Sequence, residues 1–325
     1  DVVIAAGHVS GGVWWSDASV HWQECIACNE RLSEGVHEEE NGVCKVCGYS
    51  EAGAPSLEYE QRGEGYVVTG IGSVKGTGIF VPQQYNGLPV IGIADQAFYG
   101  CRTLTRVQLP EGLQTIGDLA FKDCASLADV VFPSTLKSIG ASAFEDCVKL
   151  TEVELPAGME QIEANAFSGC ARLERIVLPF VGRNVQEEEY DYLGYIFGAG
   201  QANFLQQAVI ANVFVPASLK EVKVLGGNIG NSAFEGCAGI QTVRLGEGIG
   251  DIGERAFYDC FGLEYLYFEK GAGFVARQVF SGGAHTVQLK NLYIEDIAAW
   301  CAIDFTYGYA TNPATCAGNV YVGGG

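Results

Sequence analysis

The sequence has few basic residues: 19 Lys and Arg stand against 39 Asp and Glu in 325 residues, which gives a formal net charge of −20. The phosphate backbone of a nucleic acid would be repelled by this field, and no Arg-rich segment opposes it. We therefore expect no nucleic-acid partner.

Long apolar runs are also missing. No stretch approaches the roughly 18 residues that a membrane-spanning helix needs, and no basic and hydrophobic leader is found at Asp1. We expect no membrane span in this segment, and we expect that a signal peptide was removed or left out of a protein that is extracellular or attached to a cell surface.

The sequence lacks the usual catalytic motifs. It contains no His-Glu-x-x-His, no Gly-x-Ser-x-Gly and no Gly-x-x-x-x-Gly-Lys-Ser/Thr. Of its four histidines, only His285 falls outside the N-terminal part, and it lies in a glycine-rich loop with no identifiable nucleophile nearby. We therefore predict that the protein is not an enzyme.

Internal repetition is what the sequence has in abundance. The phrase Ala-Phe-x-x-Cys-x-x-Leu recurs every 23 residues, with its cysteines at Cys101, Cys124, Cys147 and Cys170. This period is the signature of a leucine-rich-repeat solenoid, in which each repeat buries its apolar face only against its neighbours. The predicted fold class is an α/β-type repeat solenoid: a right-handed leucine-rich-repeat superhelix, mostly β-strand, with irregular or short helical arcs.

Each repeat contains one short predicted strand. Val107 and Leu109 alternate with Arg106 and Gln108, so the first pair should face the core and the second pair solvent, and Pro110 should end the strand. The Ala-Phe of the return segment should fill the interior. We expect its rings to stack as a spine, formed by Phe98, Phe121, Phe144, Phe167, Phe234 and Phe257.

Six repeat cysteines occupy one structural position and should form a column: Cys101, Cys124, Cys147, Cys170, Cys237 and Cys260. Neighbouring coils lie about 4.8 Å apart, which is wider than the roughly 3.8 Å between Cβ atoms in a disulfide. A stacked column also offers no tetrahedral arrangement for a metal. We expect free, buried thiols.

The repeats resemble those of the BspA-type leucine-rich-repeat proteins of bacterial cell surfaces. The repeats of that family are similar to the pattern Ile-Gly-x-x-Ala-Phe-x-x-Cys-x-x-Leu-x-x-Val-x-Leu-Pro. The resemblance covers roughly residues 66–325, with an N-terminal cap over 66–95 and a divergent C-terminal repeat over 290–325. It implies a role in adhesion and host interaction but no particular ligand.

The period is interrupted after Pro179, and residues 180–215 are predicted to be an insertion. This segment sets an acidic run beside Tyr190, Tyr192 and Tyr195. Loops on a rigid scaffold often carry binding residues, so the insertion is one candidate contact surface. The alternative is that its apolar residues only cover the side of the solenoid.

The outward strand positions form the second candidate surface, because they should align across coils into one sheet face. In order, these positions are Arg106/Gln108, Asp129/Val131, Glu152/Glu154, Arg175/Val177, Glu221/Lys223, Thr242/Arg244, Tyr265/Tyr267 and Asn291/Tyr293. Charges alternate in sign along the first rows, which suits pairing within the sheet. Tyr265, Tyr267 and Tyr293 predict an exposed aromatic cluster that could hold a protein or a sugar ring, or could serve only strand pairing.

The N-terminal segment is different in kind. Cys25-x-x-Cys28 and Cys44-x-x-Cys47 have the spacing of two zinc knuckles, and four such thiolates can surround Zn²⁺ tetrahedrally in a structural site. The segment has too few large aliphatic residues to fold on its own core, whereas zinc contributes about 10 to 16 kcal/mol in small sites. We predict a zinc-ribbon-like module with zinc as its structural cofactor.

Two alternatives to the four-cysteine site stay open. His21 or His37 could replace one cysteine as a ligand. In a secreted chain, the cysteines could also form disulfides instead of binding metal.

The sequence therefore predicts two domains, a zinc-ribbon-like module over residues 1–55 and a leucine-rich-repeat solenoid over 56–325. The predicted function is non-catalytic recognition, in which the sheet face or the insertion binds a protein or glycan of a host or neighbouring cell. The alternative is a recognition or spacer appendage of a larger surface enzyme. We expect a monomer.

Overall fold

The structure is a computed structural model that describes residues 57–72, 77–184, 192–198, 214–270, 272–280, 287, 289–305 and 312–323 in full. Within residues 10–44 it describes the backbone of five short strands: β1 (Ser10–Ser16), β2 (Val20–Cys25), β3 (Arg31–Val36), β4 (Glu39–Glu40) and β5 (Val43–Cys44). The first three form an antiparallel sheet, and β4 pairs with β5.

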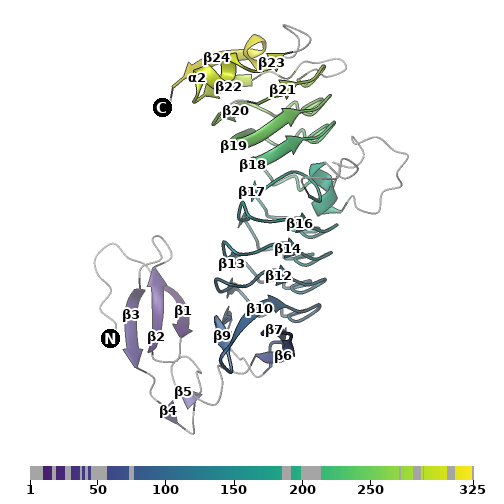
Figure 1. Cartoon of the computed structure of the whole chain (residues 1–325). Helices are drawn as coiled ribbons and strands as arrows, with labels where there is room; N and C mark the ends of the chain where they lie inside the picture. The colour runs from purple at the N-terminus through teal and green to yellow at the C-terminus, as the bar shows by residue number, and fades with distance from the viewer. Residues whose placement is uncertain are drawn as a thin grey trace.

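The repeats coil into an elongated array with two columns of short strands (Figure 1). The first column contains β8 (Gly78–Phe80), β11 (Arg106–Gln108), β13 (Asp129–Val131), β15 (Glu152–Glu154), β17 (Arg175–Leu178), β18 (Glu221–Ile229), β19 (Thr242–Ile252), β20 (Tyr265–Phe268), β22 (Leu289–Ile294) and β24 (Ala317–Val322). All of its pairings are parallel.

The second column begins at a capping hairpin and continues through the return segments. Its strands are β6 (Glu58–Arg62), β7 (Gly65–Gly70), β9 (Gln84–Tyr85), β10 (Leu88–Ile93), β12 (Thr115–Ile116), β14 (Ser138–Ile139), β16 (Gln161–Ile162), β21 (Phe274–Val275) and β23 (Asp304–Phe305). The described helices are short: η1 (Leu193–Phe197), α2 (Ile297–Cys301) and η5 (Pro313–Thr315). A repeat solenoid made mostly of strands, with very little helix, is what the sequence predicts.

The strands alternate as expected. Val107 and Leu109 are buried while Arg106 and Gln108 lie on the outer face, and the same register continues from coil to coil. One position differs from the prediction: Val177 was expected on the outer face but is only 3% exposed. Its strand, β17, therefore has both faces of its C-terminal half covered.

The phenylalanine spine forms as two stacks. Rings of successive coils lie 5.0 to 5.4 Å apart and within 18° of parallel, in the series Phe98, Phe121, Phe144, Phe167 and in the series Phe234, Phe257, Phe280. The sequence prediction did not include Phe280, because its repeat replaces Ala with Val279 and lacks the following cysteine. The interruption between the stacks coincides with the insertion.

Close contact between coils explains the glycines of the Ile-Gly pairs. A Cβ atom on Gly117 would lie 2.6 Å from the backbone nitrogen of Asp95, and one on Gly140 would lie 2.6 Å from the backbone nitrogen of Asp118. Real Cβ atoms do not come this close to backbone, so any larger residue would push the coils apart.

The cysteine column consists of free thiols, all buried except that of Cys101, which is half-buried. Four of the thiols donate a hydrogen bond to the Phe carbonyl oxygen of the preceding coil: Cys124 to Phe98 at 3.2 Å, Cys147 to Phe121 at 3.2 Å, Cys170 to Phe144 at 3.3 Å and Cys260 to Phe234 at 3.0 Å. Burial raises the pKa of the Cys124 thiol to about 12 and that of Cys147 further. The column therefore stays neutral and forms a second inter-coil ladder beside the main chain.

The insertion adds one long coil. Arg175 of β17 pairs directly with Glu221 of β18, so 46 residues, twice the usual period, separate two neighbouring strands. Within this long coil, η1 is buried, and the Ile196 carbonyl accepts the Phe167 N–H at 2.8 Å. That N–H pairs with an Ala carbonyl in the regular coils, such as Phe144 N–H with Ala166 at 2.8 Å.

We expect Phe144→Ala to lower the free energy of unfolding by about 3 to 5 kcal/mol, because the cavity would lie between two stacked rings in a layer that cannot collapse. Tyr99→Ala, at an exposed position beside Phe98 of an earlier coil, is the control and should change stability by less than about 0.5 kcal/mol. Guanidinium denaturation of the three proteins measures both effects. Equal losses of unfolding free energy in the two variants would contradict a special contribution of the stacked rings to stability.

Stability should also fall at alkaline pH because of the buried thiols. The folded Cys147 thiol has a pKa raised by burial above its ordinary 9.0, so its contribution is complete below pH 9 and is lost as the pH rises further. Above pH 9, each such thiol should make the free energy of unfolding fall by about 1.4 kcal/mol more per pH unit. Denaturation between pH 7 and 10 should show that the free energy of unfolding falls less steeply with pH in Cys147→Ala than in the wild type. Identical slopes in the two proteins would contradict the prediction.

Candidate functional site

The charged rows of the first strand column are paired within the sheet. Arg106 lies 2.7 Å from Asp129, Arg244 lies 2.9 Å from Glu221, and Arg175 contacts Glu152. Each pair is partly exposed and contributes little to stability. These rows therefore offer few unbalanced charges to a partner.

A different surface begins where the charges end. Tyr267, Tyr293 and Tyr321 occupy the same register position on β20, β22 and β24. The first two rings are stacked with centroids 4.3 Å apart and planes 2° from parallel, and the next two are stacked at 4.9 Å and 12°. The Arg244 guanidinium lies 3.8 Å from the centroid of the Tyr267 ring. We call these four residues the tyrosine ladder.

Amide side chains run beside the tyrosine ladder. The Asn291 amide donates to the Tyr293 hydroxyl at 3.2 Å, and the Asn319 amide donates to the Asn291 side-chain oxygen at 3.0 Å. Burial raises the pKa of Tyr267, while the neighbouring Arg244 opposes the rise. The Tyr267 hydroxyl therefore stays protonated at neutral pH and can both donate and accept hydrogen bonds.

Stacking decides which parts of the rings a partner can reach. Both faces of Tyr293 are covered by its neighbours, and those of Tyr267 by Arg244 and Tyr293. Only ring edges and hydroxyls of these two residues face outward, whereas Tyr321 is stacked on one side among the described residues and is 48% exposed. A sugar ring packs on an aromatic face, which carries negative charge density, while a protein surface can also use the edges. The ladder therefore suits a protein better than a glycan.

Sequence reasoning found part of this ladder. Tyr265, predicted as a member, lies one row away opposite Thr242 and Asn291 and is not part of the stack. Tyr321 was missed because it follows Tyr293 by 28 residues, outside the 23-residue period. The segment Val320-Tyr321-Val322, a tyrosine between two β-branched residues, was the feature of the sequence that could have indicated a strand there.

Within the insertion, the structure describes residues 180–184, 192–198 and 214–215, and this part is mostly buried. Tyr195 is only 4% exposed, so its ring belongs to the core and cannot serve as a contact residue, which corrects its assignment to the candidate surface. Tyr192 is half-buried and meets Tyr195 edge to face at 6.2 Å. Tyr190 and the acidic run lie outside the described residues.

Glu163 holds the insertion against the array. It stands where the preceding coils have Gly140 and Gly117, and its carboxylate accepts hydrogen bonds from Arg183 at 3.0 Å and from the Tyr195 hydroxyl at 3.2 Å. The loss of the glycine at this coil therefore marks the point where the inserted segment docks. These contacts favour the structural interpretation for the described part of the insertion.

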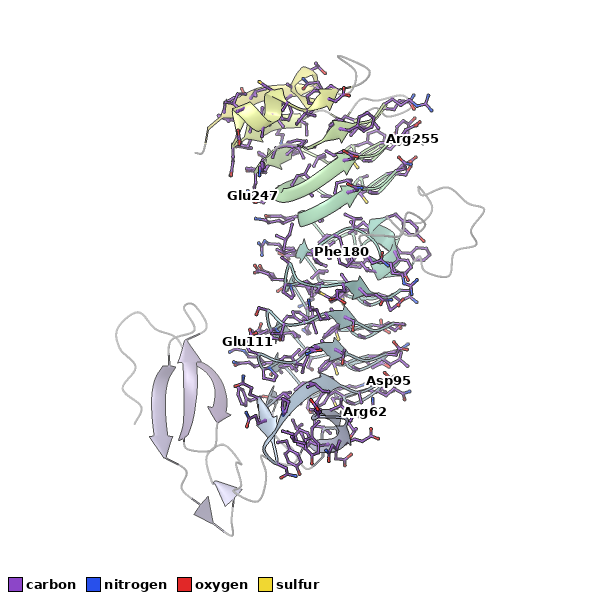
Figure 2. The ribbon with its side chains drawn as sticks, in the orientation of Figure 1. Arg62, Asp95, Glu111, Phe180, Glu247 and Arg255 are labelled. Atoms are coloured by element: carbon purple, nitrogen blue, oxygen red, sulfur yellow. The ribbon has the colours of Figure 1, made fainter. Side chains whose placement is uncertain are left out.

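A polar groove of about 290 Å³ runs along the second strand column between Arg62 and Glu163. Figure 2 shows Arg62 and Asp95 near the N-terminal end of the array. The polar atoms are already engaged: Asp95 accepts the Asp118 N–H at 2.9 Å, Asp118 accepts the Ala141 N–H at 2.7 Å, and Arg62 pairs with Glu60. The polar groups of the groove therefore hydrogen-bond to neighbouring coils, and the groove is a weaker candidate for a binding surface than the tyrosine ladder.

The predicted zinc ligands fall largely outside the described part of the chain. The backbone places Cys25 at the end of β2 and Cys44 in β5, while Cys28 and Cys47 lie outside the described residues. His37 and His285 also lie outside them, and His21 is described by its backbone in β2 only. Among the described side chains, no three His, Cys, Asp or Glu gather as a metal site would require.

Among the residues that the structure describes, no helix has the length and apolar character needed to cross a membrane.

Comparison with known proteins identifies the repeats. A family profile described as "BspA type Leucine rich repeat region" matches six copies over residues 89–193 and 204–299, which together make up more than half of the chain. None of the curated proteins matches.

Several crystal structures of leucine-rich-repeat proteins are similar to this chain. A protein from T. pallidum is 29% identical, with 64% of this chain and 87% of that chain covered and a TM-score of 0.46. A protein from Bacteroides ovatus is 18% identical, with coverages of 81% and 98% and a TM-score of 0.28. One described as a leucine rich cell surface protein, from Faecalibacterium prausnitzii, is 17% identical, with coverages of 97% and 96% and a TM-score of 0.31.

Proposed function

Because the chain belongs to the BspA-type leucine-rich-repeat family, we propose that it is a non-catalytic recognition protein that binds a protein partner of a host or neighbouring cell through the tyrosine ladder. Leucine-rich repeats typically mediate binding and are typically non-enzymatic. The observation that carries the proposal is the continuous stack of Arg244, Tyr267, Tyr293 and Tyr321 on an outward sheet face.

The composition of the ladder supports a binding role. Tyr and Arg are enriched among the residues that dominate the energy of protein interfaces. Their stacking fixes the side chains before a partner arrives, so binding would cost less side-chain entropy. The neighbouring Asn291 and Asn319 amides would supply hydrogen bonds at the rim.

The chemistry of the partner follows from what surrounds the ladder. The chain carries a net charge of −20, so a partner with a basic rim would associate faster and more selectively than an acidic one. We propose that this partner is met at the bacterial surface or outside the cell, in line with the resemblance to bacterial surface proteins. Attachment to a larger surface enzyme is compatible with the same binding role.

The binding proposal can be tested with an array of purified extracellular host proteins and a parallel glycan array, both probed with the full chain. We expect protein hits whose dissociation constants rise about 30-fold in Tyr293→Ala, which corresponds to about 2 kcal/mol for a central interface residue. Tyr99→Ala removes an exposed tyrosine far along the chain from the ladder and should bind as the wild type does.

Melting curves of these variants would separate lost binding from lost folding. Protein hits that bind Tyr293→Ala unchanged would contradict the proposed site. Hits confined to the glycan array, and lost on Tyr321→Ala, would assign the surface to a sugar.

A structural zinc ion in the N-terminal module is a separate proposal, supported by the spacing of Cys25, Cys28, Cys44 and Cys47. We expect elemental analysis to find about one zinc per chain, and Cys25→Ser to lose it. A matched Cys301→Ser variant should keep the metal. Absence of metal, together with four thiols that react only after reduction, would mean that disulfides hold this module.

A further inference from the structure

The hydrogen bonds beside the tyrosine ladder run in one direction. The Asn319 amide donates to the Asn291 side-chain oxygen at 3.0 Å, and the Asn291 amide in turn donates to the Tyr293 hydroxyl at 3.2 Å. An amide nitrogen carries two N–H donors, and a tyrosine hydroxyl that accepts a bond keeps its own proton for another. The second Asn291 N–H and the Tyr293 O–H are therefore available to a partner.

Arg244 adds further donors at one end of the ladder. Its Nε donates to the Glu221 carboxylate at 2.9 Å, and a guanidinium group carries several other N–H donors and no acceptor. The bonds within the row thus occupy acceptors at Asn291 and Tyr293 and leave donors over. A partner that matches this row presents several hydrogen-bond acceptors and few donors of its own.

The spacing of the rings sets a second condition. Ring centroids follow one another at 4.3 and 4.9 Å from Tyr267 through Tyr293 to Tyr321. Two such steps match one turn of a polyproline II helix, in which three residues rise about 9 Å. Side chains on one face of a β-strand recur about every 6.6 Å instead, so an extended strand laid along the ladder would fall out of step with the rings.

We propose that the ladder binds a proline-rich segment of its partner protein in the polyproline II conformation, lying along the row of rings across β20, β22 and β24. This inference rests on the proposed function and names the chemistry that the same site would recognise. Residues three apart in the segment would lie over Tyr267 and Tyr321, and a backbone carbonyl between them would face the Tyr293 hydroxyl.

Proline supplies the hydrogen-bonding pattern that the row requires. Each proline has a backbone C=O but no N–H, and the carbonyls of a polyproline II helix have no internal partner. Such a segment therefore brings acceptors without competing donors. It is also ordered before it binds, as the stacked rings are, so little conformational entropy would be lost on either side.

Charge beside the ladder favours a basic residue next to the prolines. Glu295 follows Tyr293 by two residues, is exposed, and forms no ion pair with a described residue. Asp296 beside it is also exposed, and these two carboxylates outnumber the exposed Lys270 at the end of β20. A Lys or Arg of the partner near Glu295 would be attracted by this field, whereas an acidic residue would be repelled.

Fluorescence anisotropy of labelled peptides with the full chain tests the proposal. The probe is a short peptide with proline at every third position and one terminal arginine. We expect saturable binding that weakens at least about tenfold when the prolines become alanine, and about tenfold in Tyr293→Phe, which keeps the ring but loses the donor. Tyr99→Phe, at an exposed tyrosine outside the ladder, should bind as the wild type does.

A second peptide, with glutamate in place of the arginine, tests the role of charge. It should bind the wild type about tenfold more weakly than the first peptide, and this difference should shrink in Glu295→Gln. Melting temperatures check that all variants are folded.

The outcomes separate this inference from the proposed function. Alanine peptides that bind as tightly as proline peptides would overturn the inference, as would unchanged affinity in Tyr293→Phe. If no peptide binds while proteins of the array still bind through Tyr293, the inference falls and the proposed function stands. If neither peptides nor proteins depend on Tyr293, both fall.

Discussion

Each coil of this protein is completed by the next one, and this dependence governs the rest of the structure. In the regular repeats, the Phe144 N–H donates to the Ala166 carbonyl of the following coil at 2.8 Å, the rings stack, and the Cys170 thiol bonds back to the Phe144 carbonyl of the preceding coil at 3.3 Å. A single coil could bury neither its backbone groups nor its apolar face. Even the insertion obeys this rule, since Ile196 supplies the carbonyl that Phe167 requires.

The same dependence makes the two ends of the array special. At the N-terminal end, β6 folds back antiparallel on β7 and presents charged residues. At the C-terminal end, α2 turns Trp300 onto Phe268 at a centroid distance of 5.0 Å, and Asp296 caps this helix through the Ala299 N–H at 2.9 Å. That closure covers the core near β20, while Val320, Tyr321 and Val322 of β24 are exposed.

The period predicts whatever recurs at one position in every coil. It places the strands, their register, the stacked rings and the buried thiols, because a 23-residue interval brings equal positions into contact. It does not predict left-handed residues with side chains, such as Leu119 at a φ of 58°, which neighbouring coils hold in place in spite of the steric cost. It also fails where spacing changes, so Tyr321 was missed and the burial of Tyr195 was not anticipated. The N-terminal cysteines stay a prediction from spacing alone.

Stability and recognition compete for the same groups in such an array. Equal positions on neighbouring coils come within about 5 Å of one another, so charges in a row find partners and aromatic rings cover each other's faces. The ion pairs of Arg106 with Asp129 and of Arg244 with Glu221 are examples of charges that already have a partner within the sheet. Tyr267 and Tyr293 show the same covering, because each has a neighbour on both ring faces, whereas the described structure gives Tyr321 one stacked ring and 48% exposure. Among the described residues, the stacked outward aromatic groups therefore gather on β20, β22 and β24, where the spacing departs from 23 residues, and not on the insertion, whose described helix is buried.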